Sequence, residues 1–117
     1  MLKILVAEDD VSTNKLLCAI LKINGYEAIP AFYGEAALDI IDHQHIDLLL
    51  CDVMMPKMDG WEVVREIRKY SQVPIIMLTA KSDEKDELLG FELGVDEYIS
   101  KPFSPKILVA RVEAILK

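Results

Sequence analysis

The sequence predicts an α/β protein with a doubly wound, five-stranded parallel sheet and five helices. Short apolar runs alternate with amphipathic helical stretches five times along the 117 residues, and this alternation is typical of right-handed β-α-β units. The most informative stretch is 48–56, in which an apolar run ends at Asp52. Because the run is too short for a free-standing helix and is apolar on both sides, it predicts a strand buried on both faces.

The first strand and helix follow directly from the amino end. Residues 2–7 form an apolar run broken by Lys3, which ends at the acidic residues 8–10. Residues 12–24 then carry apolar side chains at three- and four-residue spacing, namely Leu16, Leu17, Ile20, Leu21 and Ile23. Gly25 follows where a left-handed residue commonly ends a helix.

The second strand is predicted over 26–31, and Pro30 within it favours an edge position in the sheet. A short second helix over 34–42 places Ala37, Leu38 and Ile41 on one face. His43 and His45 follow it. Two histidines without further ligands nearby indicate a solvated loop rather than a metal site.

The third helix starts at Asp59, which with Glu62 forms a variant of the capping box. Val64 and Ile67 are expected to face the sheet, with either Trp61 or Val63 beside them. Residues 74–78 form an apolar fourth strand that ends at Thr79.

A fourth helix is predicted from the capping Ser82 to 93, and Gly94 ends it. Because its apolar positions are sparse and Gly90 lies inside it, this helix should be the least tightly packed. Residues 97–100 form a short fifth strand. Ser104 and Pro105 start the last helix, whose inner face carries Leu108, Val112 and Ile115. The weak second and fifth strands suit the edges, which gives the order 2-1-3-4-5.

Composition limits the classes of partner. The length suits a single domain over 1–117, and 52% hydrophobic with 28% charged residues is ordinary for a globular protein. A formal charge of −7 argues against nucleic acid or an anionic membrane as a direct partner and favours a cation or a basic protein. Cys18 and Cys51 suggest buried thiols in a reducing compartment. With no signal peptide and no apolar run of about 20 residues, we expect a cytoplasmic protein without a membrane partner.

Polar residues end four of the five predicted strands. Glu8 and Asp9 follow the first, Asp52 the third, Thr79 the fourth and Lys101 the fifth. Taken singly, each could be a turn residue, and Asp52 could simply cap its turn. The carboxyl ends of parallel strands share one edge, however, so a single site explains all five. Three carboxylates call for Mg²⁺, and a carboxylate can serve as a nucleophile in phosphoryl transfer. Asp52 is the candidate acceptor, with Glu8 and Asp9 as the metal pair.

The whole chain resembles the receiver domain of a bacterial two-component response regulator. The matching segments are Glu8-Asp9-Asp10, Asp52 within 52–60, Thr79-Ala80, residues 94–98 and Lys101-Pro102-Phe103. The resemblance implies the flavodoxin-like (CheY-like) fold. It also implies that Asp52 takes a phosphoryl group from the phosphohistidine of a sensor histidine kinase. Mg²⁺ would be held by Asp9, Asp52 and the backbone carbonyl of Met54, with Glu8 acting through water.

The resemblance further implies a switch rather than an enzyme with a separate substrate. Such a domain catalyses only its own phosphorylation and dephosphorylation. Thr79 would move toward the phosphate, Tyr98 would turn inward and Lys101 would pair with a phosphate oxygen. The alternative for Tyr98 is an edge-strand aromatic that packs on the last helix. A cis peptide bond before Pro102 is also expected.

The resemblance is closest to the winged-helix (OmpR/PhoB-like) subclass, which dimerises through helix four, strand five and helix five. DNA would then be bound only by an output domain absent from this chain. Glu87 and Ile107 depart from the usual charge pair, in which a basic and an acidic residue occupy these places. Arg111 with Asp96 or Glu97 remains available for a cross-subunit pair.

Two other functions conflict with the sequence, and a third agrees with it. A dehalogenase-type phosphatase requires a second carboxylate two residues after its nucleophile, where this chain has Met54. An FMN binder requires a Ser/Thr/Gly-rich loop after the first strand, where this chain has acids that repel phosphate. A stand-alone receiver that acts through protein contacts or a phosphorelay stays open.

Overall fold

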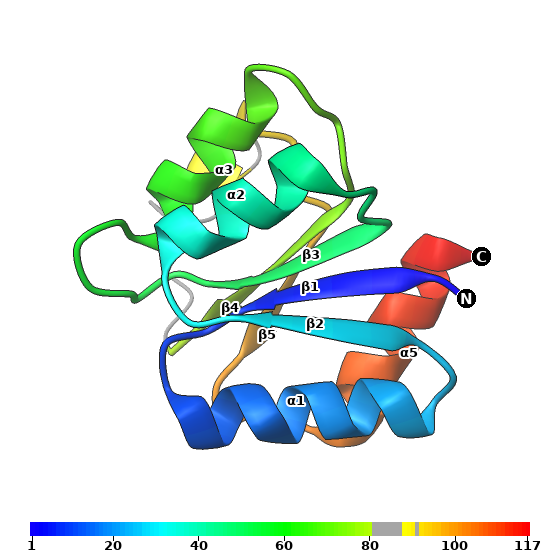
Figure 1. Ribbon diagram of the computed structural model, residues 1–117. Coiled ribbons are helices and arrows are strands. Elements are labelled where there is room, and N and C mark those ends of the chain that lie inside the picture. Colours follow the sequence, from blue (N-terminus) through cyan, green and yellow to red (C-terminus); the bar gives the residue numbers. More distant parts are fainter. Residues whose placement is uncertain (81–87, 91) are drawn as a thin grey trace.

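The computed structural model confirms the predicted sheet. The structure describes residues 1–80, 88–90 and 92–117. Five parallel strands lie in the order β2-β1-β3-β4-β5 (Figure 1). They are β1 (Lys3–Ala7), β2 (Glu27–Ala31), β3 (Leu48–Asp52), β4 (Ile75–Thr79) and β5 (Glu97–Ser100). The order reverses between β1 and β3, as the sequence predicted, so the connections from these two strands diverge to opposite faces.

Helices cover both faces of the sheet. Helices α1 (Val11–Ile23) and α5 (Pro105–Leu116) pack on one face, and α2 (Gly34–His43) and α3 (Gly60–Arg68) on the other (Figure 1). Residues 88–90 and 92 are also helical, within the predicted fourth helix. Its capping Ser82 and most of its length lie outside the described residues. The expectation that this helix packs least tightly concerns the same part of the chain and also falls outside the described residues.

The predicted helix ends are confirmed by hydrogen bonds and backbone angles. Asp59 and Glu62 form a reciprocal capping box at the start of α3. Ser104 caps α5, with Pro105 in its first turn. Gly25 and Gly94 have φ angles of 91° and 68°, which glycine adopts without a steric penalty. Each of these residues therefore stops or starts an element where the sequence indicated.

The core consists of two apolar layers, one on each side of the sheet. Both β3 and β4 are buried along their whole length, which explains their continuous apolar sequence. Pro30 lies in β2 at the edge of the sheet, as predicted. Cys18 and Cys51 are both free and buried, as expected. In the described part of the chain, no helix combines the length and apolar character that crossing a membrane requires.

The structure adds two details of helix packing to the sequence prediction. Leu16 and Ile23 of α1 are largely exposed, because the buried face of this helix is centred on Leu17 and Leu21. At 3.6 residues per turn, both side chains point about 100–120° away from Leu17, on the side of the helix opposite to Asn14 and Cys18. In α3 the sequence left a choice between Trp61 and Val63, yet both are buried. The short helix lies deep enough against β3 and α2 to bury more than one stripe.

Arg68, at the end of α3, joins segments that are distant in sequence. Its Nε donates to the carbonyl of Leu93 at 2.7 Å and its Nη2 to that of Gly94 at 3.0 Å. Its Nη1 also donates to the carbonyls of Ser71 and Val73. Burial is the main reason that the pKa of Arg68 is lowered from its usual value. One guanidinium therefore satisfies four carbonyls that follow helical turns.

Candidate functional site

The five predicted site residues lie together at the carboxyl edge of the sheet. This is the edge where the β1–α1 connection and the loop 53–59 leave their strands, on the left in Figure 1. Glu8, Asp52 and Thr79 are buried, with 1%, 3% and 3% of their surface exposed. Buried carboxylates need compensating charge or hydrogen bonds, because an isolated ion loses its hydration.

Lys101 supplies part of that compensation. Its Nζ lies 2.5 Å from Oε1 of Glu8 and 3.1 Å from Oδ2 of Asp52. The lysine is placed by the strand ladder, since its backbone N–H donates to the carbonyl of Thr79 at 2.8 Å. The Lys101–Pro102 peptide bond is cis, as expected. Burial lowers the pKa of Lys101, but its contacts with Glu8 and Asp52 outweigh burial and raise it overall.

Asp9 completes the acidic group. One ligand oxygen from each of Glu8, Asp9 and Asp52 lies within 4.8 Å of the other two. The pKa of Asp9 is raised, first by burial and then by its contact with Glu8. When all three are ionised, three carboxylates face one ammonium, so two negative charges remain unbalanced. A divalent cation fits this site in charge and in the chemistry of its oxygen donors.

The neighbouring Asp10 has a different role. Its carboxylate accepts hydrogen bonds from the backbone N–H and the hydroxyl of Thr13, which caps α1. These hydrogen bonds lower the pKa of Asp10. Of the three consecutive acids, two therefore serve the site and the third starts the helix that follows.

The backbone around Asp52 is closely packed. The N–H of Met54 contacts Oδ1 of Asp52 at 3.4 Å. Gly60 lies against the Asp52 carbonyl so closely that an added Cβ would come within 2.3 Å of that oxygen. Its N–H also donates to the carbonyl of Val53 at 2.9 Å. A glycine is required here for steric reasons, and it brings the start of α3 against the backbone of Asp52 and Val53.

Tyr98 faces the helical layer formed by α2 and α3. Its ring centroid lies 6.3 Å from that of Trp61 in α3. A Cβ built on Gly90 would overlap its hydroxyl, at 1.2 Å. The alternative that Tyr98 packs on the last helix was therefore wrong, because α5 lies on the opposite face of the sheet.

Asn14 was not singled out from the sequence. It is fully buried in α1, and its side chain contacts the carbonyls of Val6, Glu8 and Ala31. A polar residue on the apolar stripe of a predicted helix was the available signal. His43 and His45 are both exposed, as expected for solvated residues, although His43 is the last residue of α2 and not part of a loop.

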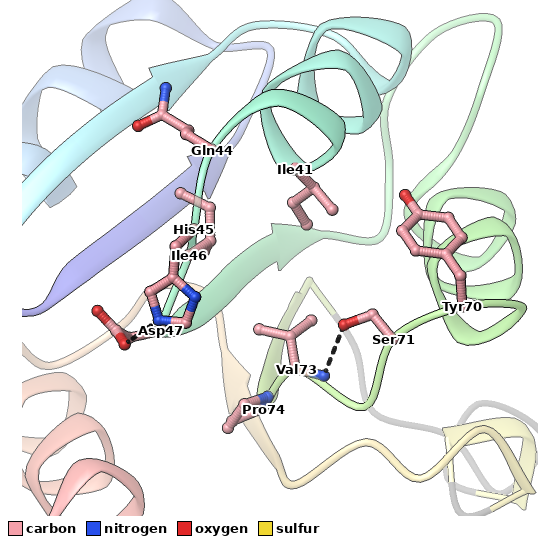
Figure 2. A pocket seen from close by; sticks show the side chains of 9 residues that line it. All are labelled: Ile41, Gln44, His45, Ile46, Asp47, Tyr70, Ser71, Val73 and Pro74. Carbon is pink, nitrogen blue, oxygen red and sulfur yellow. Dashed lines mark hydrogen bonds and ion pairs between the residues drawn. The ribbon is translucent and has the colours of Figure 1, made fainter.

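A separate pocket lies away from this site. It has a volume of about 550 Å³ and opens at the amino ends of β3 and β4 (Figure 2). His45 contacts Asp47 there at 2.7 Å, and Ser71 accepts a hydrogen bond from the N–H of Val73. Its polar side chains thus pair with their own neighbours. Charged groups converge at the opposite edge of the sheet instead.

A doubly wound sheet with an acidic group and a lysine at its switch point defines the receiver class of α/β proteins. The family model described as response regulator receiver domain matches residues 4–113. This chain belongs to that family, the signalling domain of two-component systems.

Known relatives agree with this assignment. The chain is 52% identical over 115 residues to a probable transcriptional regulator, ycf27, of Porphyridium aerugineum, covering 98% of this chain and 48% of the relative. The chemotaxis protein CheY4 of Vibrio cholerae superposes with a TM-score of 0.95 at 31% identity, covering 99% of both chains. The response regulator DrrB of Thermotoga maritima, an OmpR/PhoB homologue, superposes with a TM-score of 0.89 at 36% identity. The match covers 99% of this chain and 52% of DrrB. The chain thus spans about half the length of the curated relatives it matches.

Proposed function

We propose that residues 1–117 form one receiver domain that acts as a phosphorylation-activated switch, with Asp52 as the phosphoacceptor. The observation that carries this proposal is the placement of the Lys101 ammonium between two buried carboxylates, Glu8 and Asp52. An ammonium in that position can pair with an oxygen of a phosphoryl group on Asp52. A purely structural ion pair would not explain the third carboxylate, Asp9, beside it.

Mg²⁺ is the cofactor that fits these residues. Its ligands would be Asp9, Asp52 and the backbone carbonyl of Met54, with Glu8 acting through water. One carboxylate oxygen from each of Glu8, Asp9 and Asp52 lies within 4.8 Å of the other two, so these residues could hold a single small cation that prefers oxygen ligands. When bound, the ion neutralises charge on the oxygens of the transferred phosphoryl group.

The phosphoryl donor is the phosphohistidine of a sensor histidine kinase. A carboxylate oxygen of Asp52 attacks phosphorus, and the P–N bond to the imidazole breaks. The electron pair of that bond stays on the ring nitrogen, which takes up a proton, and the new P–O bond makes an acyl phosphate. Lys101 and the Thr79 hydroxyl stabilise the phosphoryl oxygens. The domain promotes only its own phosphorylation and dephosphorylation and is not a conventional enzyme.

Phosphorylation is read out on the surface of helix four, β5 and α5. Thr79 ends β4 beside Asp52, and Tyr98 lies on the neighbouring strand β5. Movement of Thr79 toward the phosphate changes the space available to Tyr98. The equilibrium between two positions of this tyrosine then alters the surface that partners contact.

The relatives that continue beyond this region are named as transcriptional regulators, which supports a DNA-binding output domain. Two features bear on the homodimer that the resemblance to the OmpR/PhoB-like subclass implies. Ile107 is exposed where an acidic residue is usual, and Glu87 lies outside the described residues. Arg111 contacts Glu97 of its own chain at 3.3 Å, while Asp96 accepts a hydrogen bond from the N–H of Ile75. A cross-subunit ion pair of Arg111 thus requires this residue to leave Glu97 of its own chain.

That intrachain pair favours a second candidate, a receiver that signals as a monomer through protein contacts or a phosphorelay. Crosslinking with and without beryllofluoride, a phosphate mimic, separates the two. A dimer that forms only with the mimic supports the first candidate, and an unchanged monomer supports the second.

The phosphoacceptor is tested by intact mass after incubation with acetyl phosphate and Mg²⁺. We expect one added phosphoryl group, absent without Mg²⁺ and absent in Asp52→Asn. Asp59→Asn is a matched control, because Asp59 is a nearby acid that caps α3. It should take up the group as the parent does. No addition to the parent under any condition would refute the proposal.

A further inference from the structure

The amide of Asn14 is the polar group that joins α1 to the ends of two strands. Asn14 is fully buried on the same helix face as Leu17 and Leu21. A buried amide on an apolar face is tolerated only where its hydrogen bonds are made. The contacts of this side chain therefore indicate why it is there.

Those contacts all lead to one place. Nδ2 lies 3.1 Å from the carbonyl of Val6, 3.0 Å from that of Glu8 and 3.1 Å from that of Ala31. An amide has two N–H hydrogens, so one of them is shared between two carbonyls. On its other side, Oδ1 accepts a hydrogen bond from the thiol of Cys18 at 3.3 Å. Every polar atom of the side chain is satisfied.

The three carbonyls belong to the carboxyl ends of β1 and β2, where the ladder between the strands stops. The N–H of Glu8 donates to the carbonyl of Ala31 at 3.0 Å, which is the last bond between these two segments. Asn14 binds the same carbonyl and also the carbonyl of Glu8. The peptide group on each side of the Glu8 Cα is thus held by a hydrogen bond.

The carbonyl of Glu8 and the N–H of Asp9 belong to one planar peptide unit. Fixing that carbonyl fixes the direction in which the chain continues to Asp9. Asn14 touches neither carboxylate, yet it determines the backbone from which both project. We propose that Asn14 is a positioning residue for the cation site, an inference that rests on the proposed Mg²⁺-dependent function.

Metal sites respond strongly to such supporting contacts, because ligands must be held within about 0.5 Å of the productive geometry. Loss of a supporting hydrogen bond around a metal ligand typically lowers metal affinity about 10- to 100-fold. A side chain that merely stabilised the fold would lower the stability and leave the affinity of the folded protein unchanged.

The test compares Asn14→Leu with Leu17→Ala. The first variant keeps the size of the side chain and removes both donors. The second creates a cavity on the same helix face without touching the strand-end carbonyls. For each, Mg²⁺ affinity is measured by calorimetry, and the unfolding free energy by denaturant titration in EDTA. We expect Asn14→Leu to bind Mg²⁺ at least tenfold more weakly than the parent and Leu17→Ala to bind within twofold of it.

A second variant, Asn14→Ser, keeps one hydroxyl donor and should bind Mg²⁺ with an intermediate affinity. It takes the place of Asn14→Leu if that variant does not fold. Equal affinities in the parent and the Asn14 variants would overturn the inference and leave the proposed function standing. An equal loss of Mg²⁺ affinity in Leu17→Ala would also overturn the inference and leave the proposed function standing. A parent that binds no Mg²⁺ would overturn the proposed function itself, and the inference with it.

Discussion

Lys101→Met is the substitution for which the structure makes the sharpest prediction. The methionine keeps the length of the side chain and removes the ammonium that lies between Glu8 and Asp52. Removing one partner of a buried ion pair leaves an uncompensated charge, which typically costs 3–5 kcal/mol. Because 26% of the Lys101 side chain is exposed, water screens part of this cost, and we expect about 3 kcal/mol.

The loss of stability in Lys101→Met should depend on Mg²⁺, and this dependence tests whether the site binds a cation. Unfolding entropy is about 2.1 cal/mol/K per residue, so 3 kcal/mol corresponds to a decrease in Tm of about 12 °C for this chain in EDTA. The ammonium also repels a bound cation. Without it, Mg²⁺ affinity should rise at least tenfold, which returns about 1.4 kcal/mol at saturating Mg²⁺. The variant is therefore destabilised most in EDTA and clearly less in Mg²⁺.

The assay is denaturant and thermal unfolding of parent and variant, each in EDTA and in 10 mM Mg²⁺, at about pH 7. Lys106→Met is the matched control, because Lys106 is an exposed lysine of α5 away from the acidic group. It should change stability by less than about 0.5 kcal/mol in either buffer. A loss below about 1 kcal/mol for Lys101→Met, or one that Mg²⁺ leaves unchanged, would refute the assignment of this edge as a cation site.

Three further predictions concern Gly90, Arg68 and Asp9. Gly90→Ala should displace the Tyr98 ring, because an added Cβ overlaps its hydroxyl, and the emission of Trp61, the single tryptophan, should change. Arg68→Lys should lower the unfolding free energy by about 2–4 kcal/mol in denaturant titration, because an ammonium cannot reach all four carbonyls. Asp9→Asn should stabilise the metal-free protein at pH 7, because a raised pKa in the folded state means that ionised Asp9 destabilises it. That gain should disappear in unfolding measurements as the pH falls below the ordinary value of 3.8.

Each of these has an outcome that contradicts it. Gly90→Ala in a Tyr98→Leu background should leave the emission unchanged, and a change there would show that the tyrosine is not the cause. Arg65→Lys, in the same helix at an exposed position, should be neutral; an equal loss would assign the effect to α3 in general. A gain for Asp9→Asn that persists at pH 3 would mean that ionisation is not its source.

Local patterns determined the order and type of the elements. Continuous apolar runs identified β3 and β4, because a strand covered on both faces needs apolar side chains on both. Caps at Asp59 and Ser104 placed helix starts, since they depend on contacts within four residues. The edge position of β2 followed from Pro30, which lacks a ladder donor. These features act over short distances, and the sequence displays them directly.

The acidic group and Lys101 were also predicted, because parallel strands end at a common edge and the polar residues follow four of them. Which side chains of this group form ion pairs with one another was not predicted. That Lys101 contacts Glu8 as well as Asp52 depends on where β5 ends relative to β1, two strands that are not neighbours in the sheet. Asp10, the third of the consecutive acids after β1, instead caps α1 by accepting a hydrogen bond from the N–H of Thr13.

Only the tertiary structure decided which side chains support the site. Asn14 acts on carbonyls 6, 8 and 31, and Gly60 on the carbonyl of Asp52, through contacts that no periodicity in the sequence reveals. The exposure of Leu16 and Ile23 likewise depended on the exact rotation of α1 against the sheet. Burial and side-chain contacts of this kind are set by packing between distant segments. The sequence by itself therefore determined the fold and the polar residues that gather at one edge of the sheet, and the packing decided how those residues are held.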